Sequence, residues 1–190
     1  MTVSLGFRVK SGFAVAIVLS GSSAAPVALA RRVVLLSDPD SPETKQPYHG
    51  GFGTAQQDLK VIARLTKIVG RCAERSVADL LADSVLEGRT CRAAGLVVGS
   101  VINPAVVGNP HIRAHASEGR LFRTVLEDAL RAHGVTCTVL VEKSLGALAP
   151  KALGCPASRI KKTVGGFGAV LHGPWRAEEK AAAIAAWMVL

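Results

Sequence analysis

The first 36 residues alternate short apolar, β-branched runs with small turns. The runs cover residues 3–10, 13–19 and 27–36, and they are separated by Ser11-Gly12 and by a Gly/Ser segment at 20–23. Enrichment in β-branched residues between such turns is typical of antiparallel strands joined in a meander. We therefore predict three antiparallel strands at the start of the chain.

After residue 53 the apolar positions follow a helical spacing, interrupted by two further strands. The run at 93–101 is apolar throughout, which is typical of a strand buried on both faces, and a second strand is predicted at 135–142. Gly70 is placed to break the first helix, and Gly165 to Gly168 are predicted to form a loop. The predicted helices cover residues 54–86, 110–133, 144–153, 157–164 and 176–190.

Residues 37–53 show neither the strand pattern nor the helical spacing of apolar residues, and they are rich in proline, glycine and serine. Irregular segments of this length inside compact domains are usually functional or mobile. The end of the segment, residues 46–53, contains His49 and is a candidate site segment. An ordinary surface loop is the alternative interpretation.

The composition indicates a globular protein with an anionic partner. Of the 190 residues 49% are apolar and 19% charged, which predicts a single folded domain over residues 1–190. The net charge of +9 favours nucleic acid or another anionic ligand, with a general solubility role as the alternative. Because only eight residues are aromatic (Trp 2, Tyr 1, Phe 5), phosphate contacts are favoured over base stacking.

Three features bear on the compartment. The four cysteines show no CxxC or metal-ligand spacing, which favours the reducing cytoplasm. Residues 8–30 imitate a secretory signal, but their apolar run is short and is interrupted by Gly12 and by the turn at 20–23. No apolar run is long enough to span a bilayer. We therefore expect a cytoplasmic protein without a membrane partner.

Residues 110–133 carry the strongest local signal for a site. Asn109 and Pro110 suit a helix start, and spacings of four and three place His111, His115 and Glu118 on one face. Arginines, including Arg113 and Arg123, surround this face. Such groups are costly to bury without partners, so the segment is a candidate functional site.

Three interpretations of this helix remain open. A transition metal on His111, His115 and Glu118 is disfavoured, because the third group is hard to direct at the same ion and the arginines repel a cation. An anion site is favoured, with His115 able to act as acid or base near neutral pH. In the third interpretation the histidines are structural and the chain is an interaction module.

The order of elements, and several local runs, resemble the ribonuclease H-like superfamily. Residues 6–16 (GFRVKSGFAVA) resemble the first hairpin of bacterial Holliday-junction resolvases and pre-ribosomal-RNA nucleases, which read roughly G-[IL]-D-P-G-x-x-x-x-G-x-A. Residues 159–168 (RIKKTVGGFG) and the alanine-rich final helix resemble the end of the resolvases. The resemblance implies an α/β fold with a mixed five-stranded sheet, three antiparallel strands followed by parallel strands, the fourth beside the first, and flanking helices.

The chain departs from this resemblance at its catalytic carboxylates. The family implies two metal ions held by acids on the first strand, the fourth strand and the last helix. Here Arg8, or Lys10 with a two-residue slip, takes the first-strand position, and the fourth-strand position falls near Ser100. Glu178 and Glu179 remain on the last helix. A cation in the first position would repel Mg²⁺, so we predict a degenerate two-metal site.

The sequence therefore predicts a nucleic-acid- or phosphate-binding protein of ribonuclease H-like fold, with no metal and no cofactor. A diverged, metal-independent hydrolase or nuclease using the His111, His115 and Glu118 helix is one alternative, and a protein–protein interaction module is another. The oligomeric state stays open. The candidate catalytic residues are His115, Glu118 and Glu142. The candidate ligand-binding residues are Lys10, Ser11, Ser100, His111, Arg113, Arg123 and Lys180.

Overall fold

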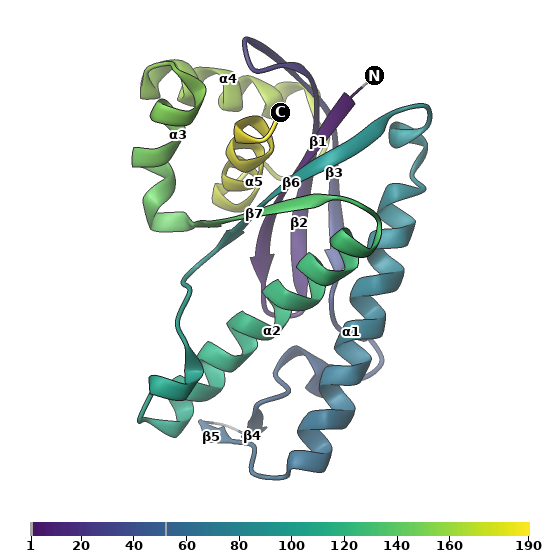
Figure 1. Cartoon of the computed structure of the whole chain (residues 1–190), viewed down its shortest axis with the longest axis vertical. Coiled ribbons are helices and arrows are strands. Elements are labelled where there is room, and N and C mark those ends of the chain that lie inside the picture. The colour runs from purple at the N-terminus through teal and green to yellow at the C-terminus, as the bar shows by residue number, and fades with distance from the viewer. Residues whose placement is uncertain (1, 52) are drawn as a thin grey trace.

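A computed structural model describes residues 2–51 and 53–190. Within these residues, five strands form one mixed sheet in the order β3-β2-β1-β6-β7 (Figure 1). β1 to β3 are antiparallel, whereas β6 runs parallel to both β1 and β7. This confirms the predicted fold class, including the fourth long strand beside the first. The strands are β1 (Thr2–Lys10), β2 (Phe13–Ser22), β3 (Ala25–Leu35), β6 (Thr90–Val98) and β7 (Thr136–Val141).

Helices cover both faces of the sheet, and the alternation of side chains along β1 shows which helices cover which face. The odd-numbered side chains of β1, from Val3 to Val9, join a core with α1 and α2. The even-numbered positions face α5, which packs with α3 and α4 on the other side of the sheet (Figure 1). The helices are α1 (Leu59–Leu81), α2 (Pro110–Ala132), α3 (Leu145–Leu153), α4 (Ala157–Val170) and α5 (Ala177–Met188).

Helix α5 lies unusually close to the sheet. A Cβ at Gly6 of β1 would overlap the Ala182 carbonyl, and one at Gly95 of β6 would lie 2.6 Å from the Ala185 carbonyl oxygen. Only glycine in the strands and small residues on the helix permit this approach. Trp187 is 1% exposed and donates its indole N–H to the Ser23 carbonyl at 2.8 Å, so it anchors the helix in the core.

The predicted start of the first helix was wrong. α1 begins after Asp58, whose carboxylate accepts the Lys60 and Val61 N–H groups, and Thr54–Ala55 instead form β5. β5 pairs with β4 (His49–Gly51) in a small hairpin. Gly70 does not break α1, because the apolar stripe on both sides of it is buried against the sheet.

The predicted loop at residues 165–168 was also wrong, because α4 continues to Val170. Phe167 is buried, and a Cβ at Gly168 would lie 2.5 Å from the Trp175 ring. Packing of this turn against α5 and Trp175 thus outweighs the low helix propensity of glycine. In the described part of the chain, no helix combines the length and the apolar character needed to cross a membrane.

Candidate functional site

A pocket opens where the parallel strands β1 and β6 end. Adjacent parallel strands leave a crevice at their carboxyl ends, which is a common place for ligands in α/β proteins. Here the crevice has a volume of about 220 Å³ and is bounded on one side by Gly119 and Phe122 of α2. Lys10, Ser11 and Ser100 line it, so the structure brings these three predicted residues together.

Arg8 also lines this pocket and is paired with Glu142. Glu142 follows β7 in a 3₁₀ turn, Glu142–Ser144. The Arg8 Nη2 atom is 2.6 Å from Glu142 Oε2, and Nε donates to Oε1 at 3.2 Å. The Arg8 side chain is 9% exposed, and its Nη1 donates to the Val9 carbonyl. Glu142, predicted as a catalytic acid, is therefore held in a two-point ion pair.

The two carboxylates that start α5 are paired as well. Lys10 Nζ is 3.6 Å from Glu178 Oε1. Glu179 accepts hydrogen bonds from the Arg31 guanidinium, with Nη2 at 2.8 Å, and from the Arg176 N–H at the start of α5. Burial alone would raise the pKa of Glu179, but the hydrogen bonds from Arg31 and Arg176 outweigh it and hold the pKa below its usual range.

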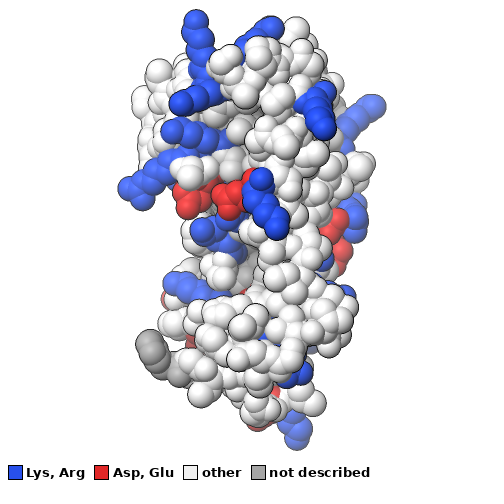
Figure 2. All heavy atoms as spheres, turned by 90° about the vertical axis from the view of Figure 1, so that its left-hand side faces the viewer, with Lys and Arg blue, Asp and Glu red and all other residues white. Residues whose placement is uncertain are grey.

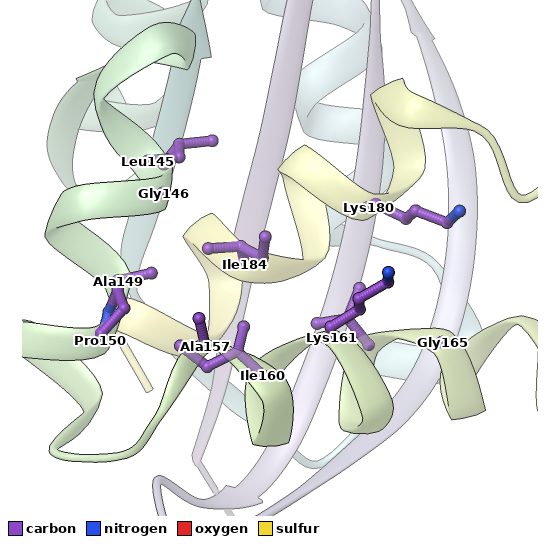
Figure 3. A pocket seen from close by; sticks show the side chains of 11 residues that line it. Leu145, Gly146, Ala149, Pro150, Ala157, Ile160, Lys161, Gly165, Lys180 and Ile184 are labelled. Atoms are coloured by element: carbon purple, nitrogen blue, oxygen red, sulfur yellow. The ribbon is translucent and has the colours of Figure 1, made fainter.

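Lys180 lies apart from this pocket, beside an apolar groove between α3, α4 and α5. The groove has a volume of about 330 Å³, and Leu145, Ile160 and Ile184 supply much of its wall. Lys161 of α4 and Lys180 of α5 both line the groove, toward the same end of it (Figure 3). The groove is thus apolar inside and basic at one edge.

The histidine helix forms a second polar cluster with the β4–β5 hairpin. As predicted, the Asn109 side chain caps α2 by accepting the Ile112 N–H at 3.1 Å. His111 and His115 lie on successive turns, with Nε2 atoms 3.2 Å apart. β4 brings in His49, whose Nδ1 is 2.6 Å from Glu118 Oε1. His115 Nδ1 is 3.9 Å from the other carboxylate oxygen of Glu118.

Burial divides this cluster into an inner and an outer part. The Glu118 and His49 side chains are 2% and 6% exposed, whereas the His115 side chain is 53% exposed. All three histidines line a pocket of about 530 Å³ together with Glu43. Glu118 would therefore act on any substrate only through a histidine.

Arg113 and Arg123 line neither of these two pockets. Arg113 is exposed and donates to the Gly108 carbonyl at 3.4 Å, and Arg123 is half-buried on α2. The predicted site residues therefore lie in separate places: the sheet end, the histidine cluster and the edge of the apolar groove. His49 was missing from the predicted set, although its proline- and glycine-rich segment was recognised as a candidate.

Comparison with known proteins gives a structural likeness and no sequence likeness. The sequence matches no protein-family model and no curated protein. The structure is similar to that of Thermus thermophilus RuvC, with a TM-score of 0.56 and 12% identity over 98% of this chain and 92% of that one. T. thermophilus RuvC in complex with a Holliday junction substrate gives a TM-score of 0.57, again with 12% identity, over 99% and 92% of the two chains. The fold is ribonuclease H-like.

Positive charge concentrates on the final quarter of the chain. Residues 143–190 contain seven basic residues and only two acidic ones, Glu178 and Glu179, both of which are paired. On the face shown in Figure 2, blue side chains gather over one half, with a small acidic group at their border. Five of the seven basic residues lie on α3, α4 and α5. The seven basic residues are Lys143, Lys151, Arg159, Lys161, Lys162, Arg176 and Lys180.

Proposed function

We propose that this protein binds nucleic acid by its phosphates, at the sheet-end pocket and across the basic surface of α3 to α5, without two-metal hydrolysis. One observation carries the proposal. Each of the carboxylates Glu142, Glu178 and Glu179 is paired with a basic side chain, while the surrounding surface keeps an excess of positive charge. That combination favours an anionic ligand over bound cations.

The residues present do not fit the two metal ions that the resolvase resemblance implies. A pair of Mg²⁺ ions requires several carboxylate oxygens that are free to coordinate. The Arg8 guanidinium stands where the first-strand acid is expected, and it occupies both oxygens of Glu142. Separating this pair would leave a mostly buried guanidinium without a counterion. We therefore derive no hydrolytic step through metal ions at this place.

The same residues suit phosphate binding. Lys10 contributes an ammonium group, and Ser11 and Ser100 contribute hydroxyl donors at the mouth of the pocket. Contacts of this kind fix the position of a nucleic-acid backbone without reading its sequence. The T. thermophilus RuvC structure contains a Holliday junction substrate, so branched DNA is the first ligand to test.

The test is fluorescence anisotropy with a labelled four-way DNA junction and a duplex of equal length. We expect saturable binding at 50 mM salt that weakens roughly tenfold or more at 200 mM, because phosphate binding releases counterions. Lys161→Glu with Lys162→Glu on α4 should lower the affinity at least tenfold. The matched control is Lys67→Glu with Arg71→Glu, which makes the same charge change on exposed positions of α1 and should have a smaller effect.

Two results would contradict the proposed DNA binding. One is the absence of binding to either DNA at 50 mM salt. The other is an equal loss of affinity in the α4 and α1 variants, which would show only a dependence on net charge. Incubation of the DNA with Mg²⁺ should leave it uncut, and specific cleavage that requires Mg²⁺ would disprove the absence of a two-metal site.

A second candidate function, an interaction module, is favoured by the apolar groove between α3, α4 and α5. Its apolar wall and the lysines at its edge suit a peptide with a leucine flanked by glutamates (Figure 3). Calorimetry with such a peptide tests this function, and a scrambled, neutral peptide is the control. Gly165→Trp should fill the groove, since no described atom outside the helix lies within 4 Å of a Cβ there, and should abolish peptide binding. Binding unchanged by Gly165→Trp would exclude this groove.

A further inference from the structure

Two buried nitrogens of the histidine cluster, His49 Nε2 and His111 Nδ1, have no hydrogen-bond partner among the residues that the structure describes. His49 Nδ1 is bound to Glu118 Oε1 at 2.6 Å, which fixes the proton of a neutral imidazole on Nδ1 and leaves the lone pair on Nε2. That Nε2 atom is buried, and it has no hydrogen-bond partner among the residues that the structure describes. A buried acceptor without a partner is costly, so the arrangement points to a ligand.

We propose that His49, His111 and His115 bind a divalent transition-metal ion, Zn²⁺ by preference, and that Glu118 positions His49. One ring nitrogen from each histidine lies within 4.8 Å of the others. The Nε2 atoms of His111 and His115 are 3.2 Å apart. Two nitrogens bound to one tetrahedral Zn²⁺ ion at the usual distance are about 3.3 Å apart, so this pair is already spaced for the ion.

The chain supplies these ligands in a manner typical of metal sites. His111 and His115 are four residues apart on one helix, and the third ligand comes from a distant segment. The Glu118 carboxylate beside His49 Nδ1 is the partner that metal-bound histidines usually have, since it fixes the tautomer and makes the ligand more basic. Glu118 is thus a positioning residue and does not itself contact the metal.

Hydrogen bonding between the histidines does not account for the cluster. A hydrogen bond between His111 and His115 uses the 3.2 Å contact but leaves His49 Nε2 without a partner among the described residues. Arg113 and Arg123 do not prevent metal binding either, because Arg113 turns back to the Gly108 carbonyl and Arg123 lies outside this pocket. From the sequence alone a metal is disfavoured, because nearby arginines would repel a cation. The positions of Arg113 and Arg123 weaken that argument.

The donor set indicates which ions fit and what the site leaves open. Three neutral imidazoles favour Zn²⁺, Co²⁺, Ni²⁺ or Cu²⁺ over Mg²⁺ and Ca²⁺, which prefer oxygen. The fourth position would face the pocket of about 530 Å³ that the histidines share with Glu43, so it is accessible to water or a small anion. Three protein ligands with an open position are typical of reactive zinc sites, whereas structural sites use four.

Metal binding can be tested on the whole protein after removal of metals with EDTA. A chromophoric chelator in competition measures Zn²⁺ affinity, and the visible spectrum of added Co²⁺ reports tetrahedral coordination. We expect one ion per chain with micromolar or tighter affinity. His115→Ala should weaken Zn²⁺ at least about a hundredfold, and Glu118→Gln about 10- to 100-fold through His49. His172→Ala, an exposed histidine outside the cluster, is the matched control and should bind as the native protein does.

The proposal is overturned if Co²⁺ gives no saturable tetrahedral spectrum, or if native protein and His115→Ala bind Zn²⁺ equally. Circular dichroism of each variant separates loss of a ligand from loss of the fold. Since the His115 side chain is 53% exposed, its removal should leave the fold intact. Either result leaves the proposed DNA binding untouched, because that is tested through residues on α4.

Discussion

Two polar regions lie along the same helix, and they differ in how their carboxylates are used. Near Gly119 and Phe122, α2 borders the sheet-end pocket, where Glu142 and Glu178 are each paired with a basic side chain. One and two turns earlier, His115 and His111 lie beside Glu118, a carboxylate whose shortest contact is with His49. The first region pairs its acids with basic side chains, whereas the second region uses its acid to orient a histidine.

The difference shows that the chemistry of a cluster of charged residues depends on which side chains are paired with one another. Arg8 binds both oxygens of Glu142, and separating the pair would leave a mostly buried guanidinium alone. Glu118 has the opposite effect on His49, since holding the proton at Nδ1 keeps Nε2 free to bind.

The largest expected effect separates the histidine cluster from the proposed DNA-binding surface, which joins the sheet-end pocket to α4. His111→Ala should weaken Zn²⁺ binding about a hundredfold or more, because one of three ligands is lost, and should change junction affinity less than twofold. Lys161→Glu with Lys162→Glu should lower the junction affinity and leave Zn²⁺ binding nearly unchanged. Chelator competition and anisotropy on the same preparations measure both. If either variant lowers both affinities, the two regions form a single site and the comparison fails.

A smaller effect, of about 2 kcal/mol, is expected when Glu179 loses its charge. The Glu179 side chain is 3% exposed and accepts charged hydrogen bonds from Arg31, so Glu179→Gln should destabilise the fold at pH 7. The pKa of Glu179 is held below its ordinary value of 4.5, so its contribution is present above pH 4.5 and is lost as pH falls through the lowered pKa.

Urea unfolding from pH 7 down to pH 3 checks the role of Glu179. The difference in free energy of unfolding between the native protein and Glu179→Gln should narrow as the solution becomes more acidic. A gap that stays constant with pH would show that the cost arises from packing and not from charge.

An effect of about 1–2 kcal/mol is expected at the sheet end from Glu142→Ala. This change leaves the mostly buried Arg8 guanidinium without its partner, and the 41% exposure of Glu142 reduces the cost below that of a fully buried pair. Arg131→Ala breaks the helical pair with Glu127 at an Arg131 side chain that is 58% exposed, and it should cost under about 0.5 kcal/mol. Equal losses of unfolding free energy would mean that Arg8–Glu142 is only a surface pair.

The smallest effect is expected from His115→Ala in metal-free protein. Because the side chain is 53% exposed, the change should alter the free energy of unfolding by under about 0.5 kcal/mol. Added Zn²⁺ should stabilise the native protein and the His172→Ala control but not this variant. A loss above 1 kcal/mol without metal would make His115 a structural group.

The sequence predicted the sheet well because the signals for its strands are local. The runs at β1, β2 and β3, the continuous apolar β6 and the capped start of α2 can be recognised within a few residues. Errors arose where a distant contact decided the structure. Gly168 stays helical against Trp175, and Thr54 pairs in a hairpin instead of starting α1. That residues 1–190 form one domain stays a prediction.

Prediction of the candidate sites was likewise limited where a contact between distant residues decided the structure. The helix period placed His111, His115 and Glu118 together, and the positive charge was evident from composition. Only the tertiary structure decided that Glu142 pairs with Arg8, and that His49 lies 2.6 Å from Glu118 although 69 positions separate them in the chain. Periodicity describes the neighbours that a residue has within its own helix or strand. The partner that sets a side chain's chemistry here comes from another element, and packing of the whole core brings the two together.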